Sequence, residues 1–161
     1  FSSLKMFRAS VRIFLAEAFF FSMSSYKLIT DGAYSSKLDQ GGLGLVFLKD
    51  DKLILRYSKM YRHTTNNQME LGAIITGLKC ITKPIDNLTI VSDSMYCIGC
   101  ATKGWKRSKN VKLWEEFDRQ YTRVSELCPN IVFEHVKGHN GDKWNEYCDK
   151  LATTASKRMR D

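Results

Sequence analysis

Four acidic residues lie where the sequence pattern predicts a change from one element to the next. Asp31 and Asp93 each follow a short apolar run. Glu70 follows a polar stretch at residues 64–67, and Asp149 lies within a late helical pattern. A single Asp after a strand is usually a turn or capping residue. Four such acids with amide and histidine companions instead predict a site, because carboxylate oxygens are hard ligands suited to divalent cations.

The elements around these acids are expected to bring them together. The Thr and Asn residues at 64–67 suit the start of a helix, because their side-chain oxygens accept an unpaired backbone N–H. Glu70 is therefore predicted in the first turn of this helix, where the local field favours an anion. Asp31 and Asp93 are each predicted at the end of a strand. Strand ends and a helix start meet at one edge of an α/β sheet, and ligands bind outside such edges.

The order of the elements predicts a single mixed α/β domain. Short apolar runs indicate strands, and apolar residues at helical spacing indicate helices. The expected strands are 26–30, 43–48, 53–58, 88–92 and 131–136, and the expected helices run from near Met69, Ser94, Val111 and Trp144. Three strands are thus followed by alternating helices and strands, without a repeat or a linker.

The turns between the first three strands carry their own signals. Asp50-Asp51 is predicted as a hairpin turn. Gly41, Gly42 and Gly44 could suggest a phosphate cradle, but no phosphate-binding glycine motif is found between a strand and a helix. These three glycines are therefore predicted to be hairpin and bulge residues.

The charge of the chain bears on its substrate. The 161 residues carry a formal net charge of +8, with 43% hydrophobic and 26% charged residues. This length and composition fit one globular domain with its own core. A basic protein with clustered acids suits a polyanionic substrate that Lys and Arg hold and a carboxylate metal site cuts. The plainer alternative is a small domain that is simply basic.

The first residues of the chain do not predict a membrane span. The apolar run at 11–23 is interrupted by Arg12 and Glu17, and a span needs about 20 apolar residues. A signal or transit peptide is one alternative. We expect residues 1–22 to be an extension outside the fold, and the domain to occupy residues 23–161.

The cysteines do not predict a disulfide framework. There are five of them, at scattered positions, and an odd number leaves one without a partner. Cys97 and Cys100 have the spacing of a redox motif but lack its flanking context. We expect both to be small apolar residues of a helix.

Five segments, taken in order, resemble the type 1 ribonuclease H (ribonuclease HI) family. They are residues 29–33, 64–71, 92–96, 136–141 and 145–152. The resemblance extends over roughly residues 26–156 and implies the ribonuclease H-like α/β fold, a five-stranded mixed sheet flanked by helices. It also implies an endonuclease that hydrolyses the RNA strand of an RNA–DNA hybrid and leaves 5′-phosphate and 3′-hydroxyl ends.

The resemblance assigns roles to five residues of the site. Asp31, Glu70, Asp93 and Asp149 match the four metal-ligand carboxylates of the family, and His139 matches its loop histidine. The implied cofactor is a pair of Mg²⁺ ions, for which Mn²⁺ can substitute, and the pair would clamp the scissile phosphate. His139 would handle a proton or assist product release. No protein nucleophile is needed.

The resemblance also implies contacts with the substrate. Selection is expected through the shape of the hybrid and through the 2′-hydroxyl. The expected contacts are Gly32, Ala33, Tyr34, Thr65, Asn66, Asn67, Trp105 and Lys106. The first three and Asn66 would meet RNA ribose edges, Asn66 and Asn67 could reach minor-groove base edges, and Thr65 would bind a DNA phosphate. Trp105 and Lys106 would carry the DNA strand by stacking and phosphate contacts.

Plainer roles remain open for several of these residues. Asn66 and Asn67 could only cap the helix, and Trp105 could fold onto the core. The basic stretch at 102–110 is shorter than in several bacterial members of the family. Lys37 and Met95 stand where the family often has Asn and Gln. Two minor-groove contacts could therefore be missing.

Two other functions compete with the hybrid ribonuclease. One is a hybrid-binding module without turnover, and the intact set of four carboxylates argues against it. The other is a nuclease domain cut from a reverse transcriptase polyprotein. We expect a monomeric, cytoplasmic protein whose partner is the RNA–DNA hybrid, without a membrane association and without a separate hybrid-binding domain.

Overall fold

The predicted order of strands and helices is confirmed. The computed structural model describes residues 24–138 and 141–159. Its elements are β1 (Ser25–Ser35), β2 (Gln40–Lys49), β3 (Lys52–Arg62), α2 (Asn66–Lys79), β4 (Asn87–Ser92), α3 (Met95–Thr102), α4 (Val111–Leu127), β5 (Asn130–His135) and α5 (Lys143–Ser156). Residues 1–22 and His139 lie outside the described residues, so the predictions made for them stay predictions.

The five strands form one mixed sheet in the order β3-β2-β1-β4-β5. The first three strands are antiparallel neighbours, and β4 and β5 add to β1 in parallel. Asp50 and Asp51 form the predicted hairpin turn, with φ of 50° and 65°. Two-residue turns with both residues at positive φ match the twist of the flanking strands. The mixed sheet brings the end of β4 beside the middle of β1.

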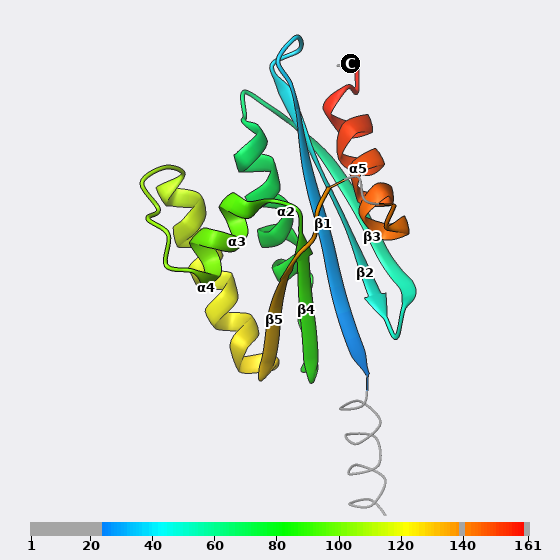
Figure 1. Ribbon diagram of the computed structural model, residues 1–161, viewed down its shortest axis with the longest axis vertical. Coiled ribbons are helices and arrows are strands. Elements are labelled where there is room, and N and C mark those ends of the chain that lie inside the picture. Colours follow the sequence, from blue (N-terminus) through cyan, green and yellow to red (C-terminus); the bar gives the residue numbers. More distant parts are fainter. Residues whose placement is uncertain (1–23, 139–140, 160–161) are drawn as a thin grey trace, which may run out of the picture.

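Helices cover both faces of the sheet, with α2, α3 and α4 on one side and α5 on the other (Figure 1). The larger core cluster lies under α2, α3 and α4 and includes Leu28, Leu45 and Ile90, while a smaller one lies under α5. The buried Cys97 and Cys100 are free thiols of α3, as predicted. Among the described residues, no helix has the length and apolar character needed to cross a membrane.

The glycines of β2 do not have the predicted role. Gly42 and Gly44 lie in regular antiparallel pairing with β1, and the irregularity of β2 falls at Phe47/Leu48. A Cβ on Gly42 would overlap the backbone of Ala152, and one on Gly44 would lie 2.7 Å from the carbonyl oxygen of Cys148. These glycines therefore let the backbone of α5 approach the sheet closely. The bulge prediction was wrong. These glycines are needed for a contact between residues more than a hundred positions apart, which a local sequence pattern does not show.

Candidate active site

Register places Asp31 and Asp93 side by side. The parallel strands β1 and β4 pair as far as Ile29↔Val91, so each Asp lies two residues beyond the same pair. Asp93 follows the last residue of β4, as predicted. Asp31 does not end its strand, because β1 continues to Ser35 through pairing with β2. It lies instead where β1 loses β4 as its neighbour.

Glu70 reaches this edge from α2. The helix is capped by Thr65, whose Oγ1 accepts a hydrogen bond from the Gln68 N–H at 3.2 Å. Glu70 is therefore in the second turn, not in the predicted first turn. A Cβ on Gly32 would overlap the backbone of Met69 and Glu70. Because Gly32 has no side chain, α2 packs directly on β1 and holds Glu70 beside Asp31.

Three carboxylates converge at this point. One oxygen each from Asp31, Glu70 and Asp93 lies within 4.8 Å of the others. Asp31 is 7% exposed and Glu70 is 5% exposed. Oε2 of Glu70 is fully buried and has no hydrogen-bond partner among the described residues. A buried polar atom left without a partner lowers stability by about 1–3 kcal/mol. A cation bound at this oxygen would remove that penalty.

The electrostatics of the cluster give the same indication. Burial raises the pKa of Asp31 above its ordinary value, and the charge of Asp93 raises it further. Burial also raises the pKa of Glu70, followed by the charges of Asp31 and Asp93. Both shifts disfavour the ionised forms in the absence of a cation. The three acids therefore fit a divalent ion, which would stabilise them in the charged state.

Asp149 belongs to a second, adjoining position. It lies partly buried on α5 and is not part of the three-carboxylate cluster. A recess of about 10 Å³ is lined by Asp31, Asp93, Gly138, Asn145, Glu146 and Asp149. That volume is close to the space one water molecule needs. Asp31 and Asp93 thus border both an inner position with Glu70 and an outer position with Asp149.

Several residues of this site were missed from the sequence. Asn145 and Glu146 share the recess with Asp149, and their spacing on α5 was the signal that could have found them. Gly138 leaves room for Asp93, since a Cβ there would lie 3.0 Å from Asp93 Oδ2. A ring nitrogen of His135 lies 3.2 Å from the backbone oxygen of Asp93. No sequence pattern predicts that contact.

The predicted RNA contacts lie on β1 just after Asp31 and at the start of α2. Gly32 and Ala33 follow Asp31 on β1 and are partly exposed. The exposed Tyr34 donates a hydrogen bond from its hydroxyl to Asp39 Oδ1 at 2.8 Å. Thr65 is the helix cap, so the exposed Asn66 and Asn67 are not the capping residues. The plainer prediction of capping by these asparagines was wrong, because they are the first two residues of α2 and Thr65 is its cap.

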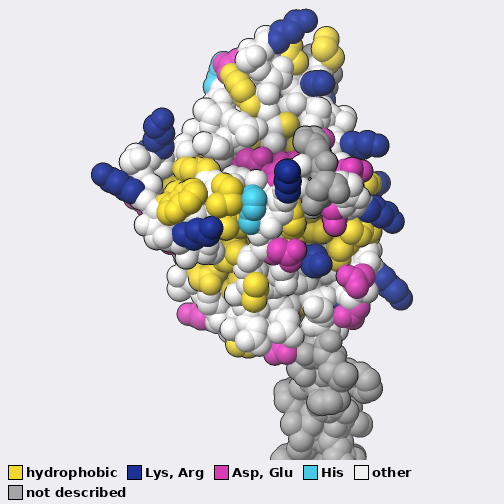
Figure 2. Space-filling view, viewed as in Figure 1, with side chains coloured by type: hydrophobic (Ala, Val, Ile, Leu, Met, Phe, Trp, Pro, Cys, Tyr) yellow, Lys and Arg dark blue, Asp and Glu magenta, His cyan; other side chains and the backbone are white. Residues whose placement is uncertain are grey.

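Trp105 and Lys106 lie in the segment between α3 and α4. Trp105 is 47% exposed, yet its ring lies against Gly99, where a Cβ would overlap the indole. The tryptophan therefore packs partly on α3 and keeps a large part of its surface open. Lys106 is exposed. In Figure 2, acidic side chains lie near the middle of the face and also along its right and lower margins, and most Lys and Arg side chains project from the margins.

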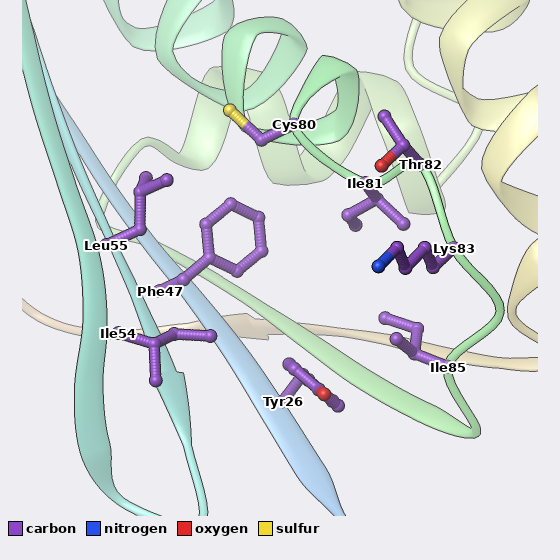
Figure 3. Close-up of a pocket in the computed structure, with 9 residues that line it drawn as sticks. All are labelled: Tyr26, Phe47, Ile54, Leu55, Cys80, Ile81, Thr82, Lys83 and Ile85. Atoms are coloured by element: carbon purple, nitrogen blue, oxygen red, sulfur yellow. The ribbon is translucent and has the colours of Figure 1, made fainter. Parts of the chain in front are cut away.

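A separate apolar pocket of about 290 Å³ lies beside the start of β1. The strands provide Tyr26, Phe47, Ile54 and Leu55, and the segment after α2 provides Cys80, Ile81, Thr82, Lys83 and Ile85. Figure 3 shows the strand side chains facing those of this segment across the pocket. Among the residues that the structure describes, the pocket shares no lining residue with the carboxylate recess and has no acidic side chain.

Comparison with known proteins gives a consistent result. The sequence profile of the RNase H family matches residues 23–157. Ribonuclease H of Rhodopirellula baltica is 38% identical over 150 residues, which cover 80% of this chain and 89% of that protein. Ribonuclease H of Caldicellulosiruptor saccharolyticus is 33% identical over 86% of this chain and 100% of its own length. Ribonuclease HI of Synechocystis sp. is 33% identical, with 82% and 88% covered.

Proposed function

The chain belongs to the ribonuclease H family, and we propose that its carboxylate site hydrolyses the RNA strand of RNA–DNA hybrids. The observation that carries this proposal is the convergence of Asp31, Glu70 and Asp93 within 4.8 Å. It is strengthened by the orphaned Oε2 of Glu70, which calls for a cation. Because a hybrid is a polyanion, a net charge of +8 also suits this substrate.

The two adjoining positions support a site for two divalent ions. Asp31, Glu70 and Asp93 would hold the inner ion, and Asp31 with Asp149 would hold the outer one. Mg²⁺ is the ion we propose, with Mn²⁺ as a substitute, because the donors are carboxylate oxygens. When bound, such ions would lower the pKa of a bound water and would stabilise negative charge on the leaving 3′-oxygen.

The chain's own residues prepare this chemistry. The Gly32 N–H donates to Asp31 Oδ1 at 2.9 Å and fixes the orientation of that carboxylate. Packing of α2 against Gly32 fixes Glu70. Among the described residues, no Ser, Thr, Cys or Lys lines the recess. The proposed nucleophile is water, and the proposed products carry 5′-phosphate and 3′-hydroxyl ends. His139 is proposed to handle a proton or to assist product release.

The residues around the site are proposed to select the hybrid. Gly32, Ala33, Tyr34 and Asn66 would meet the RNA strand, where the 2′-hydroxyl distinguishes RNA from DNA. Asn67 would reach base edges of the minor groove, and Thr65 would bind a DNA phosphate. Trp105 and Lys106 would hold the DNA strand, and the exposed part of the indole supports stacking.

We also infer a monomeric enzyme that works in the cytoplasm, with its domain at residues 23–161. The free state of the five cysteines supports a reducing compartment. The match of the family to residues 23–157 supports the domain boundary. A nuclease domain cut from a reverse transcriptase polyprotein has less support. The three relatives named above are ribonucleases H matched over 88–100% of their own lengths.

The test is cleavage of a labelled RNA–DNA hybrid in Mg²⁺, beside RNA and DNA duplexes, by the wild-type protein and by Asp93→Asn. Cleavage of the hybrid RNA alone, abolished in the variant, is the expected result. Analysis of the product ends would identify the 5′-phosphate. Tight hybrid binding by the wild-type protein without cleavage in Mg²⁺ or Mn²⁺ would overturn the proposal in favour of a hybrid-binding module.

A further inference from the structure

The carboxylate of Asp39 joins the end of β1 to the segment after β3, although these two strands are not neighbours in the sheet. Asp39 is the last residue of the turn between β1 and β2, and His63 is the first residue after β3. Oδ1 of Asp39 accepts a hydrogen bond from the Tyr34 hydroxyl at 2.8 Å. Oδ2 lies 2.7 Å from Nδ1 of His63. An ionised carboxylate only accepts hydrogen bonds, so Nδ1 of His63 is the donor.

The backbone at Asp39 and His63 supports the same contact. The N–H of His63 donates to the backbone oxygen of Asp39 at 3.0 Å. Both residues have positive φ values, 45° for Asp39 and 51° for His63. This conformation is uncommon for residues other than Gly, although Asp and His adopt it more readily than most. The two segments therefore meet through an uncommon backbone conformation on each side.

The segments joined by Asp39 carry proposed substrate contacts. Tyr34 is one of them, and His63 comes shortly before Thr65 and Asn66. An acid at this place repels the phosphates of a hybrid. The side chains of His63 and Asp39 are 76% and 52% exposed, and exposed ion pairs contribute little to stability. The contacts of Asp39 therefore indicate a role in holding its neighbours in place.

We propose that Asp39 is a positioning residue for hybrid binding, which fixes Tyr34 relative to the segment that leads into α2. This inference rests on the proposed function. Side chains and loops lose freedom when a ligand binds, and contacts that order them beforehand increase affinity. Asp39 supplies this order through its hydrogen bonds. It acts on binding of the hybrid and not on the chemical step.

Charge and position predict opposite results at Asp39. If only its charge mattered, removing that charge would tighten binding of the polyanionic hybrid. Asp39→Gly removes the charge together with the side-chain contacts, and glycine adopts a positive φ without strain. Asp39→Asn removes the same charge, but its oxygen can accept from Tyr34 and its NH₂ group can donate to a neutral His63 ring. The two variants therefore separate the effect of the contacts from that of the charge.

The experiment measures the Kd of a fluorescein-labelled RNA–DNA hybrid by fluorescence anisotropy in EDTA, and kcat and KM for its cleavage in Mg²⁺. Asp39→Gly should raise Kd and KM by about three- to tenfold and leave kcat unchanged. Asp39→Asn should bind at least as tightly as the wild-type protein. The matched control is Asp51→Gly, which makes the same change at an exposed turn residue with a φ of 65°. It should keep the wild-type Kd.

A double-mutant cycle tests the hydrogen bond between Tyr34 and Asp39. Tyr34→Phe removes only the hydroxyl group and should raise Kd in the wild-type background. In the Asp39→Gly background the same change should have no further effect, because the contact is already lost. Effects of the two variants that multiply would show that these residues act independently, which would overturn the inference.

The remaining outcomes are equally decisive, once thermal unfolding has shown that each variant is folded. Wild-type or tighter binding by Asp39→Gly would overturn the inference and leave the proposed function intact. The same loss in Asp39→Asn or in Asp51→Gly would also overturn it, because the effect would then come from charge. Failure of the wild-type protein to cleave the hybrid would refute the proposed function, whereas the anisotropy comparison would still decide whether Asp39 supports hybrid binding.

Discussion

The apolar pocket and the carboxylate recess show that the size of a cavity and its chemistry are separate properties. The pocket beside β1 has about 290 Å³, whereas the recess at the end of β4 has about 10 Å³. The pocket is lined mainly by apolar side chains, and the recess by three Asp, one Glu, one Asn and a Gly. Chemistry is expected in the small cavity, because its carboxylates suit divalent metal ions.

The two regions also differ in what they contribute to stability. Apolar side chains such as Phe47 stabilise the fold when they leave water. Asp31 and Glu70 do the opposite, since burial and mutual repulsion penalise their charged forms. The carboxylate site is therefore a place where the fold gives up stability for function. Variants at the carboxylate site should therefore lower activity, and variants in the apolar pocket should lower stability.

The largest effect is expected for Glu70→Gln. The change keeps the shape of the side chain but removes a charged ligand, and cleavage of the hybrid should fall by about 10³-fold or more. Single-turnover cleavage in Mg²⁺ measures this loss. The matched control is Glu115→Gln, which changes an exposed acid early in α4 that does not line the recess. A variant that keeps more than a tenth of the wild-type cleavage rate would show that Glu70 is not required. The assignment of activity to the carboxylate site would then be contradicted.

Phe47→Ala should give the largest loss of stability. Phe47 is 5% exposed and belongs to both the core and the apolar pocket. Truncating such a side chain costs about 3–5 kcal/mol, which urea unfolding would measure. Cleavage per folded molecule should stay at the wild-type level, because the pocket shares no residue with the recess. A lower rate in the fully folded variant would contradict the separation of the two regions.

A smaller effect is expected from pH in the metal-free protein. The folded-state pKa values of Asp31 and Glu70 are raised, so their contribution to stability is complete below the ordinary carboxyl pKa of 3.8 to 4.5. It is lost as the pH rises through the folded-state values. Thermal unfolding in EDTA should show stability falling by about 1–3 kcal/mol toward neutral and higher pH.

Two controls sharpen this pH prediction. Mg²⁺ should restore stability at neutral and higher pH, because the bound ion favours the charged carboxylates. Glu70→Gln should flatten the decline, because it removes the carboxyl group with a raised pKa at the centre of the cluster. A wild-type protein that gains stability in EDTA over this range would show that the cluster does not control the pH dependence.

Much of the fold could be predicted from the sequence because its signals are local. Thr65 and Ser94 mark helix starts by accepting hydrogen bonds from N–H groups three residues later. Asp50-Asp51 marks a turn through its own backbone angles. The meeting of Asp31 and Asp93 could also be expected, since parallel strand ends share an edge. These features depend on a few adjacent residues and on general rules of sheet topology.

The features that were missed depend on contacts between distant parts of the chain. β1 continues past Asp31 because β2 pairs with it there. Gly42 of β2 is needed because α5 passes close to it, and that helix lies more than a hundred residues later. Glu146 faces the recess only because α5 is docked in this way. Short-range patterns carry no information about such docking.

The smallest effect is expected for Ile54→Ser, and it is the most direct test of the apolar pocket. Ile54 is 54% exposed on the edge strand β3 and faces the pocket (Figure 3). A polar residue there should change the free energy of unfolding by no more than about 0.5 kcal/mol. The kcat and KM for the hybrid should be those of the wild-type protein. A raised KM without a change in stability would mean that the pocket takes part in substrate binding. In that case the pocket would be part of the substrate-binding surface although it has no acidic side chain among its described residues.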